Sequence, residues 1–330
     1  MIPRKKNNHK IIERLNELRY AYRGTFRSWW PDYVFHFTEI RNAVQILEDE
    51  RLYSRNQIEA RKLTYFDAAS PSIISHSSEH VKDYVRFYFR PKTPTQYRME
   101  GIRPDSKRWI DSDGNPAHCP VPIFFLFDAP ALLAREDCEY TDGNFASDTA
   151  TKGNTAEFFC NLPFSQIYHT GAYDKTDPAN WQISHRRCAE VLIPNELDLT
   201  HLRAIACRSV AEKETLLSLL PSRLHKKFEL LIRVPNYPLF FKEWTHVENV
   251  RMTPTQIRIQ FSPDSTTAGP FVAVAEITDL STGDIVLDKI VRGYNANVLA
   301  LITLPSSLLY YDFKLTLDSN IAYQNTYFPF

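Results

Sequence analysis

The chain has 330 residues, of which 43% are apolar and 24% charged, and its formal net charge is zero. This composition is typical of a soluble globular protein, and no apolar run reaches the roughly 18 residues of a membrane span. Five dispersed cysteines without a CxxC pair exclude a disulfide framework and a zinc site of the usual spacing. The basic start lacks the apolar stretch of a secretory signal, so we expect a cytoplasmic protein that is not embedded in a membrane.

The first 30 residues are predicted to contain a basic helix. They hold eight Lys or Arg residues and two Glu residues, a balance of +6. Apolar residues recur at helical spacing over 9–20. This segment fits either a solvated helix or an arm that attracts nucleic-acid phosphates. A second helix is expected over 38–52, with Thr38 as its N-cap.

Three apolar segments in the middle of the chain are predicted to be strands. They cover residues 80–89, 119–128 and 188–194, and a helix is expected over 210–221. The segment 139–187 lacks a clear periodicity and is expected to form long loops with short helices. Helices and strands mixed in this order predict an α+β fold.

From residue 228 the pattern changes to short alternating strands with turn residues between them, which predicts an all-β sandwich. The expected strands are 228–234, 246–252, 256–261, 271–279, 284–293, 300–305 and 311–319. The tail contains no cysteine and is a better candidate for a binding module or a stabilising appendage than for an active site. The expected organisation is a basic helix at 1–30, a domain of mixed helices and strands at 31–227 and an accessory β-domain at 228–330.

Several common chemistries are absent from the sequence. There is no G-x-G-x-x-G, no P-loop, no H-E-x-x-H and no G-x-S-x-G motif. The ten histidines have no paired metal-ligand spacing, so no metal is expected. A bound nucleotide would have to be held by side chains in an irregular cleft.

Four segments carry the candidate functional residues. His36 ends a short strand before a helix, where it either opens onto a cleft or satisfies the helix start. Residues 83–97 interleave aromatic and cationic side chains, which suits a stacked base with its phosphates or an aromatic core strand with a charged edge. Asp142 and Gly143 indicate a turn. Glu190 interrupts an apolar strand, so it either faces solvent or lies in a cleft and does chemistry, because burying an unpaired carboxylate is costly.

Together these segments resemble the DarT family of DNA ADP-ribosyltransferase toxins. The first motif, H-[ILVF]-T followed by a helix with Asn and Ile-Leu, is matched by His36, Phe37, Thr38, Asn42, Ile46 and Leu47. The "DYVRFYFRPKTP" segment matches the family's aromatic strand, and "AEVLIP" (189–194) matches its last motif. The three motifs occur in the family order, and the resemblance covers about residues 31–225.

The resemblance implies an ADP-ribosyltransferase-like split mixed β-sheet with a cleft for NAD. It implies attachment of ADP-ribose to a base in single-stranded DNA, with Glu190 as the catalytic residue. A carboxylate there would stabilise the positive charge that develops at the ribose C1′, and would help to deprotonate the attacking base nitrogen. Many family members are toxins neutralised by an antitoxin, often in phage defence. The C-terminal domain would then bind an antitoxin, a chaperone or a phage trigger.

The resemblance, together with residue type, also suggests binding residues. The NAD-binding set is His36, Phe37, Thr38, Asn42, Tyr84, Arg86, Tyr88 and Arg90. The loop at about 161–187 corresponds to the family's substrate-recognition loop, where stacking and phosphate contacts are expected. The DNA-contacting set is Trp181, His185, Arg186 and Arg187.

The chain departs from the family pattern in two places. The stretch before the aromatic strand lacks the family's arginine for the NAD phosphate, so Arg55, Arg61, Arg86, Arg90 or His76 would replace it. Arg86 itself stands where proline is usual. Two alternatives to DNA modification therefore stay open. One is ADP-ribosylation of RNA or a protein side chain, and the other is a catalytically inactive module that senses a nucleotide.

Overall fold

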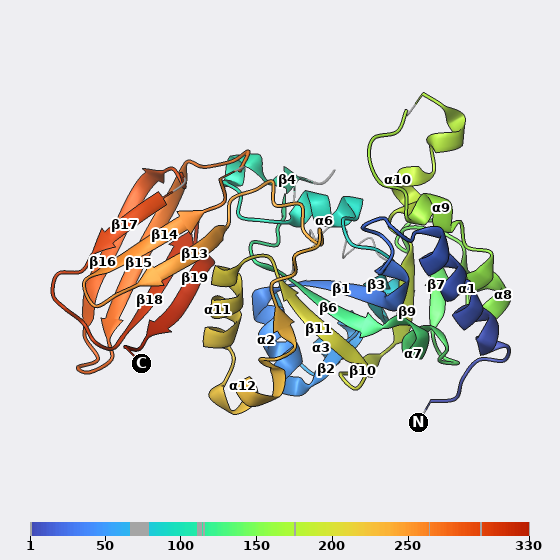
Figure 1. The fold of residues 1–330 in the computed structure, drawn as a ribbon, viewed down its shortest axis with the longest axis horizontal. Helices are drawn as coiled ribbons and strands as arrows, with labels where there is room; N and C mark the ends of the chain where they lie inside the picture. The colour runs from blue at the N-terminus through green and yellow to red at the C-terminus, as the bar shows by residue number, and fades with distance from the viewer. Residues whose placement is uncertain are drawn as a thin grey trace.

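An eight-stranded mixed sheet forms the centre of the N-terminal part of the molecule (Figure 1). The computed structural model describes residues 2–66, 79–110, 114, 116–174, 176–263, 265–297 and 299–329. The strand order is β12-β11-β6-β1-β3-β9-β7-β8, with β11 and β12 parallel and the other neighbours antiparallel. The strands are β1 (Tyr33–Glu39), β3 (Tyr84–Tyr88), β6 (Pro122–Asp128), β7 (Glu139–Thr141), β8 (Lys152–Gly153), β9 (Glu190–Pro194), β11 (Leu202–Cys207) and β12 (Ile232–Arg233).

The sheet splits between β1 and β3. β1 is paired with β6 over seven residue pairs, from Tyr33 with Asp128 to Glu39 with Pro122. It is paired with β3 at a single position, Phe35 with Tyr88. The two strands therefore diverge, and side chains enter the space where ladder hydrogen bonds would otherwise form.

Short helices cover the sheet. The N-terminal helix α1 (Asn8–Ala21) buries Ile11, Leu15 and Leu18 in the same core as the sheet. The basic segment is thus packed into the first unit, with only its polar face in solvent. The other helices of this unit are α2 (Ile40–Asp49), α3 (Arg55–Ala60), α5 (Glu79–Lys82), α6 (Pro94–Met99), α7 (Ala129–Leu133), α8 (Ala156–Cys160), α9 (Phe164–Ile167), α10 (Ile183–Arg186), α11 (Val210–Leu219) and α12 (Ser222–Phe228).

The start of α2 differs from the sequence-based expectation. Its N-cap is Glu39, whose carboxylate accepts the backbone N–H of Arg41 at 2.8 Å. The β1–β6 ladder runs through Thr38 to Glu39, so the helix begins at Ile40 and the cap is the residue directly before it, Glu39 rather than Thr38. Two small sheets complete this half: β2 (Arg51–Tyr53) with β10 (Glu196–Asp198), and β4 (Trp109–Ile110) with β5 (Pro116–Ala117).

Two antiparallel sheets form the C-terminal part and enclose a second apolar core. One has the order β13-β14-β17 and the other β16-β15-β18-β19. The expected α+β class with an added β-rich tail is therefore confirmed. The strands are β13 (Val247–Met252), β14 (Gln256–Phe261), β15 (Phe271–Asp279), β16 (Ile285–Tyr294), β17 (Leu299–Thr303), β18 (Tyr311–Leu317) and β19 (Asn320–Tyr327).

The first core continues beyond residue 227. β12 is part of the large sheet, and Leu239 and Phe240 are buried in the first core. The expected strand at 228–234 shrinks to two residues because Phe228 still belongs to α12. The carboxylate of Glu100 accepts the backbone N–H groups of Phe241 and Lys242 at 3.1 and 2.9 Å. We therefore propose that the two units meet near residue 242.

The helix α11 joins the two units and lies between them (Figure 1). Ala211 packs in the C-terminal core, and Leu216 packs in the core of the large sheet. Thr215 Oγ1 accepts the backbone N–H of Gln324 at 3.1 Å, and the Tyr323 hydroxyl donates to Glu214 at 2.8 Å. The helix is thus held by side chains from both sides.

Candidate active site

Glu190 is completely buried at the start of β9, and its carboxylate is held by three donors. Arg86 Nε donates to Oε2 at 2.5 Å, and Arg86 Nη2 donates to Oε1 at 2.7 Å. The backbone N–H of Phe145 donates to Oε1 at 3.0 Å. The carboxylate therefore does not face solvent but lies inside, in a bidentate ion pair.

The antiparallel register explains the pairing with Arg86. Tyr88 lies opposite Glu190, and Arg86 lies opposite Leu192, so Arg86, Tyr88 and Glu190 share one face. The Arg86 side chain is one third exposed, whereas that of Glu190 is fully covered. Although burial alone would lower it, the pair with Glu190 raises the pKa of Arg86 above its ordinary value. Burial, and next the charge of Glu190, also raises the pKa of Tyr88, so this phenol stays neutral.

His36 occupies the split between β1 and β3. Burial lowers its pKa to about 4, so the imidazole is neutral at pH 7. Its Nδ1 lies 3.0 Å from the carbonyl oxygen of Arg86. Because a carbonyl only accepts, Nδ1 carries the proton and Nε2 is left as an acceptor.

His36 and Glu190 approach β3 from opposite faces. Side chains alternate along a strand, so Phe87 points away from the face that carries Arg86 and Tyr88. The His36 ring lies on the Phe87 side, with the two ring centroids 5.7 Å apart. Glu190 lies on the Arg86 side. Arg86 therefore connects the two residues, through its carbonyl on one side and its guanidinium on the other.

A small cavity adjoins His36. Asn42, Ile46 and the segment 63–65 line it together with His36, and its volume is about 40 Å³. Asn42 closes it by exchanging two hydrogen bonds with the backbone of Phe66, at 2.8 and 2.9 Å. Such a space holds about one water, whereas nucleotide-sized ligands occupy several hundred Å³. The residue types suit a nucleotide, but a cavity of this volume does not hold one.

Thr38 supplies an unsatisfied group near this region of β1. Its side chain is 4% exposed, and its Oγ1 has no hydrogen-bond partner among the described residues. It lies on the same face of β1 as His36, two residues away. A buried hydroxyl without a partner is uncommon in a finished core and fits a ligand-binding role.

Other residues of the expected NAD-binding set lie elsewhere. The Phe37 ring packs on the opposite face of β1, with its centroid 5.2 Å from that of Phe124. Arg90 is buried beyond the end of β3 and donates to the backbone oxygens of Pro91, Ile167 and His169. The Tyr84 hydroxyl accepts from Lys152 Nζ at 3.2 Å. The structure thus does not bring these three side chains to His36.

The replacements considered for the missing phosphate arginine are only partly placed. Arg61 is paired with Glu196 at 3.0 Å, and Arg55 lies over the ring of Tyr65. His76 lies outside the described residues. Of the arginines in the set, only Arg86 contacts Glu190 in the part of the chain that the structure describes.

Three of the four expected DNA-contacting residues, at 185–187, lie just before β9 and contact either the Asp142-Gly143 turn or the segment around Gly171. His185 packs on Gly143, where an added Cβ would lie 1.8 Å from its Nε2, so this position requires glycine. That Nε2 is buried and has no partner among the described residues. Arg186 is paired with Asp142, and Arg187 contacts His169 and the carbonyl of Gly171. Trp181 lies on the surface, 66% exposed.

Two parts of the Glu190 environment were not expected from the sequence. The backbone N–H of Phe145 and the hydroxyl of Thr141, which accepts the N–H of Glu190 at 2.9 Å, come from the segment around the Asp142-Gly143 turn. The turn signal alone marked this segment. No group of His, Cys, Asp and Glu residues in the described ranges is arranged to hold a metal ion. No helix in those ranges is long and apolar enough to cross a membrane.

Comparison with known proteins gives one family match. The model described as "ssDNA thymidine ADP-ribosyltransferase, DarT" matches residues 35–239, which begin in β1 and end at Leu239 of the first core. The structure of Thermus sp. 2.9 DarT in complex with ADP-ribosylated ssDNA is similar at a TM-score of 0.48 and 18% identity, over 64% of this chain and 97% of that one. No curated protein matches this chain.

Two further solved structures show comparable similarity. Thermus sp. 2.9 DarT in complex with NAD+ has a TM-score of 0.44 and 20% identity, over 64% of this chain and 98% of that one. Thermosipho africanus DarTG in complex with ADP-ribose has a TM-score of 0.48 and 18% identity, over 64% of this chain and 51% of that one.

Proposed function

The chain belongs to the DarT family of ssDNA thymidine ADP-ribosyltransferases, and on this basis we propose that it transfers ADP-ribose from NAD to a base of single-stranded DNA. The observation that carries the proposal is the environment of Glu190. It is a fully buried carboxylate at the position of the family's last motif, fixed by two guanidinium donors and one backbone donor. Such a preorganised negative charge suits a reaction in which positive charge develops.

The proposed reaction exchanges one glycosidic bond for another. The bond between nicotinamide and the ribose C1′ breaks, and nicotinamide leaves with the electron pair. A ring nitrogen of the base forms the new bond to C1′ and loses its proton. Glu190 stabilises the charge at C1′ and is the nearest base for that proton.

The neutral His36 and the orphaned Thr38 hydroxyl mark the proposed NAD side of β3. The unprotonated Nε2 of His36 accepts from a ribose hydroxyl, and Asn42 supplies an amide beside it. NAD brings the ADP-ribosyl group and nicotinamide as the leaving group. The ribose C1′ then faces Glu190 through the split between β1 and β3, and the acceptor base approaches from the Arg86 side, where Glu190 lies.

Arg86 controls how much of the carboxylate's charge is available. In the structure its guanidinium neutralises Glu190 through two hydrogen bonds. Because one third of its side chain is exposed, the guanidinium is free to rotate toward a phosphate when substrate binds. We propose that this rotation exposes Glu190 and replaces the phosphate contact of the family's missing arginine.

We further propose that the protein acts as a toxin in the cytoplasm and has an antitoxin partner. A modified base in single-stranded DNA blocks templating, which would make unrestrained activity harmful. The C-terminal sandwich offers a surface for the antitoxin or a trigger, since Ile290 and Leu301 on its strands are more than half exposed. Induced expression in bacteria tests this role: growth arrest that needs Glu190 is expected, and normal growth at full catalytic activity would contradict it.

Mass spectrometry of oligonucleotides after incubation with NAD tests the activity directly. The expected product is a DNA oligonucleotide that carries one added ADP-ribose on a base, with one nicotinamide released. RNA oligonucleotides of the same sequence and lysate protein serve as the other arms. Binding of NAD without nicotinamide release would instead favour the nucleotide-sensing module, for which the neutralised Glu190 is the supporting observation.

A further inference from the structure

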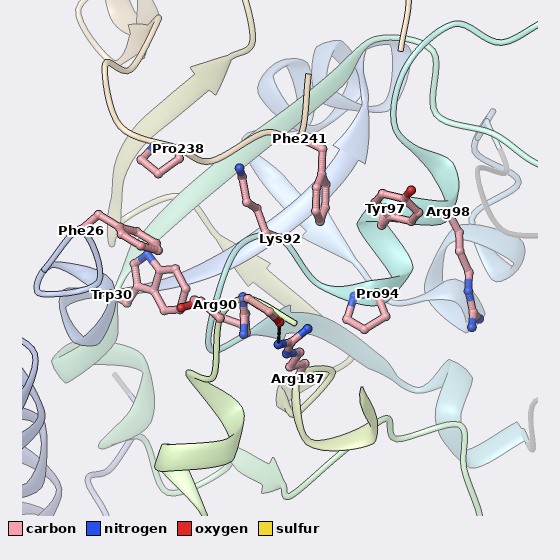
Figure 2. A pocket seen from close by; sticks show the side chains of 12 residues that line it. Phe26, Trp30, Arg90, Lys92, Pro94, Tyr97, Arg98, Arg187, Pro238 and Phe241 are labelled. Carbon is pink, nitrogen blue, oxygen red and sulfur yellow. Dashed lines mark hydrogen bonds between the residues drawn. The ribbon is translucent and has the colours of Figure 1, made fainter. Parts of the chain in front are cut away.

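A large pocket lies beside the candidate active site and is lined by aromatic and cationic side chains. Its volume is about 690 Å³. Figure 2 shows Phe26 and Trp30 on one side, Tyr97 and Phe241 on the other, and Lys92 with the two arginines Arg90 and Arg187 between them. Arg98 extends the cationic lining beyond Tyr97, and none of the described lining residues is acidic.

Two of the four cations that line this pocket, Arg90 and Arg187, have no carboxylate partner among the described residues, whereas Lys92 interacts with Glu100 and Glu243. Arg90 is 3% exposed and contacts only backbone oxygens and the Trp30 ring, 4.8 Å from its centroid. Arg187 donates to His169 and Gly171, and its Nε is buried without a partner. Within the described ranges neither arginine forms an ion pair with a carboxylate. Burial, followed by the charge of Arg187, lowers the pKa of Arg90.

A third guanidinium adds to the same cluster. Arg27 donates to the carbonyl of Tyr168 at 3.1 Å, and its Nε is also buried with no partner in the part of the chain that the structure describes. Burial and then the charges of Arg187, Arg90 and Arg27 lower the pKa of His169. Like charges in a partly desolvated site repel each other strongly, and an anion placed among them would relieve that repulsion.

The aromatic residues are arranged for stacking. Phe26 and Tyr97 are 48% and 45% exposed, and each ring packs against a second aromatic ring. Phe26 packs edge-on against Trp30, and Tyr97 packs against Phe241 with their centroids 5.1 Å apart. The indole N–H of the fully buried Trp30 has no partner among the described residues. Exposed ring faces beside uncompensated cations are the surface on which single-stranded nucleic acids bind.

We propose that this pocket binds the single-stranded DNA substrate next to the modified nucleotide, with the phosphates at Arg90, Lys92 and Arg187 and flanking bases stacked on Phe26 and Tyr97. Arg187 precedes Glu190 by three residues, which span at most roughly 10 Å. A strand whose acceptor base lies at Glu190 therefore passes over the pocket. The pocket extends beyond the matched family residues 35–239, since Phe26, Trp30 and Phe241 lie outside them.

The test is binding of labelled thymine-rich oligonucleotides to the full chain without NAD, measured by fluorescence anisotropy. Probes of about 12 and about 4 nucleotides separate a flanking contact from a contact with the modified nucleotide. Lys92→Gln and Arg187→Gln are each expected to lower the slope of log affinity against log salt for the longer probe by about 0.7. Phe26→Ala is expected to weaken the longer probe about 5- to 150-fold. The shorter probe should lose less in every variant.

A matched control is Arg223→Gln. Arg223 is 68% exposed and pairs with Glu48 on α2, outside the residues that line the pocket. It should leave binding and its salt slope unchanged. Wild-type affinity in all three pocket variants would overturn the proposal, as would equal losses for both probes. Tighter binding of RNA of the same sequence would overturn the assignment to DNA.

Photocrosslinking of the unmodified protein keeps the test independent of how the variants fold. A DNA probe carrying 5-iodouracil is expected to crosslink to Phe26, Tyr97 or Phe241, located by mass spectrometry of the peptides. No crosslink to any of these rings would contradict the proposal. The inference rests on the proposed function, yet the two fail differently. If the protein modifies DNA bases but the pocket variants bind DNA as tightly as the wild type, only the proposed role of the pocket is refuted. If the pocket crosslinks to DNA but no ADP-ribose is transferred, only the proposed enzymatic activity is refuted.

Discussion

Replacing Glu190 by glutamine tests the central chemical claim, because the substitution removes one charge and almost no volume. Glutamine keeps an oxygen that accepts the Phe145 N–H, but its amide group meets the donors of Arg86. In the Glu190→Gln variant we expect Arg86, whose side chain is already one third exposed, to turn toward solvent. The loss of a charge-assisted pair costs about 1–3 kcal/mol of unfolding free energy, which a protein with about 5–15 kcal/mol tolerates.

The loss at the transition state should exceed the loss of unfolding free energy, and the protein should stay folded while its activity falls. Removal of one preorganised electrostatic group typically costs about 10²- to 10³-fold in rate, or about 2.7–4 kcal/mol at the transition state. The assay is single-turnover nicotinamide release and oligonucleotide modification, with urea denaturation of the same sample. Wild-type-like turnover in a folded Glu190→Gln protein would refute the assignment of this carboxylate.

Replacing Arg86, the partner of Glu190, tests whether the two side chains form an ion pair in solution. Arg86→Met leaves Glu190 buried with a single donor, and breaking a buried pair from one side costs about 3–5 kcal/mol. Adding Glu190→Gln to Arg86→Met should therefore recover part of that loss. Urea denaturation of the four proteins in a double-mutant cycle measures the coupling. Simple additivity would mean that the ion pair is not formed in solution.

Three further outcomes follow from buried charge and packing. Arg208→Met should lower the unfolding free energy by about 3–5 kcal/mol in urea, because it strands the fully buried Glu100 and Glu212; Arg203→Gln, at the surface, should change it little. A chain that ends at residue 242 should keep NAD turnover but aggregate, because the α11 residues that pack in the C-terminal core are then exposed. A chain that ends at residue 230 should not fold, because it lacks Leu239 and Phe240 of the first core. Equal folding of the two truncated chains would contradict a boundary near residue 242. Burial lowers the pKa of His36 to about 4 and of His118 to about 3, so both stay neutral in the fold while the unfolded chain takes up protons below pH 6.5. Stability should therefore fall from about pH 6.5 to 4, by up to about 1.4 kcal/mol per pH unit for each histidine; a flat profile would refute this.

The elements with strong periodicity could be predicted from the sequence. β14 and β15 have the expected limits because buried positions alternate with exposed ones along β14 and with half-buried ones along β15 as far as Thr278. β19 was missed because its segment, 320–327, lacks that alternation and is specified by pairing with β18. Thr38 was misplaced as a cap because its role depends on how far the β1–β6 ladder extends.

The candidate site could be predicted in its residue types but not in its geometry. Glu190 was singled out because a carboxylate is rare in such an apolar strand. Its partner Arg86 is 104 residues away, and only the register of β3 with β9 brings them together. The separation of His36 from Glu190 by the sheet likewise depends on strand alternation in three dimensions. The aromatic and cationic pocket draws on four distant segments; the pattern over 83–97 and the loop that ends at Arg187 indicated two of them, and only the fold brings these to Phe26, Trp30 and Phe241.

The position of α11 has a consequence for how the molecule melts. One turn of this helix contributes Ala211 to the C-terminal core, and the next contributes Leu216 to the other. If either unit unfolds, α11 loses its contacts there, and the core of the other unit becomes exposed where α11 covered it. Calorimetry of the intact protein should thus record a single heat-absorption peak, although the chain contains two separate hydrophobic interiors.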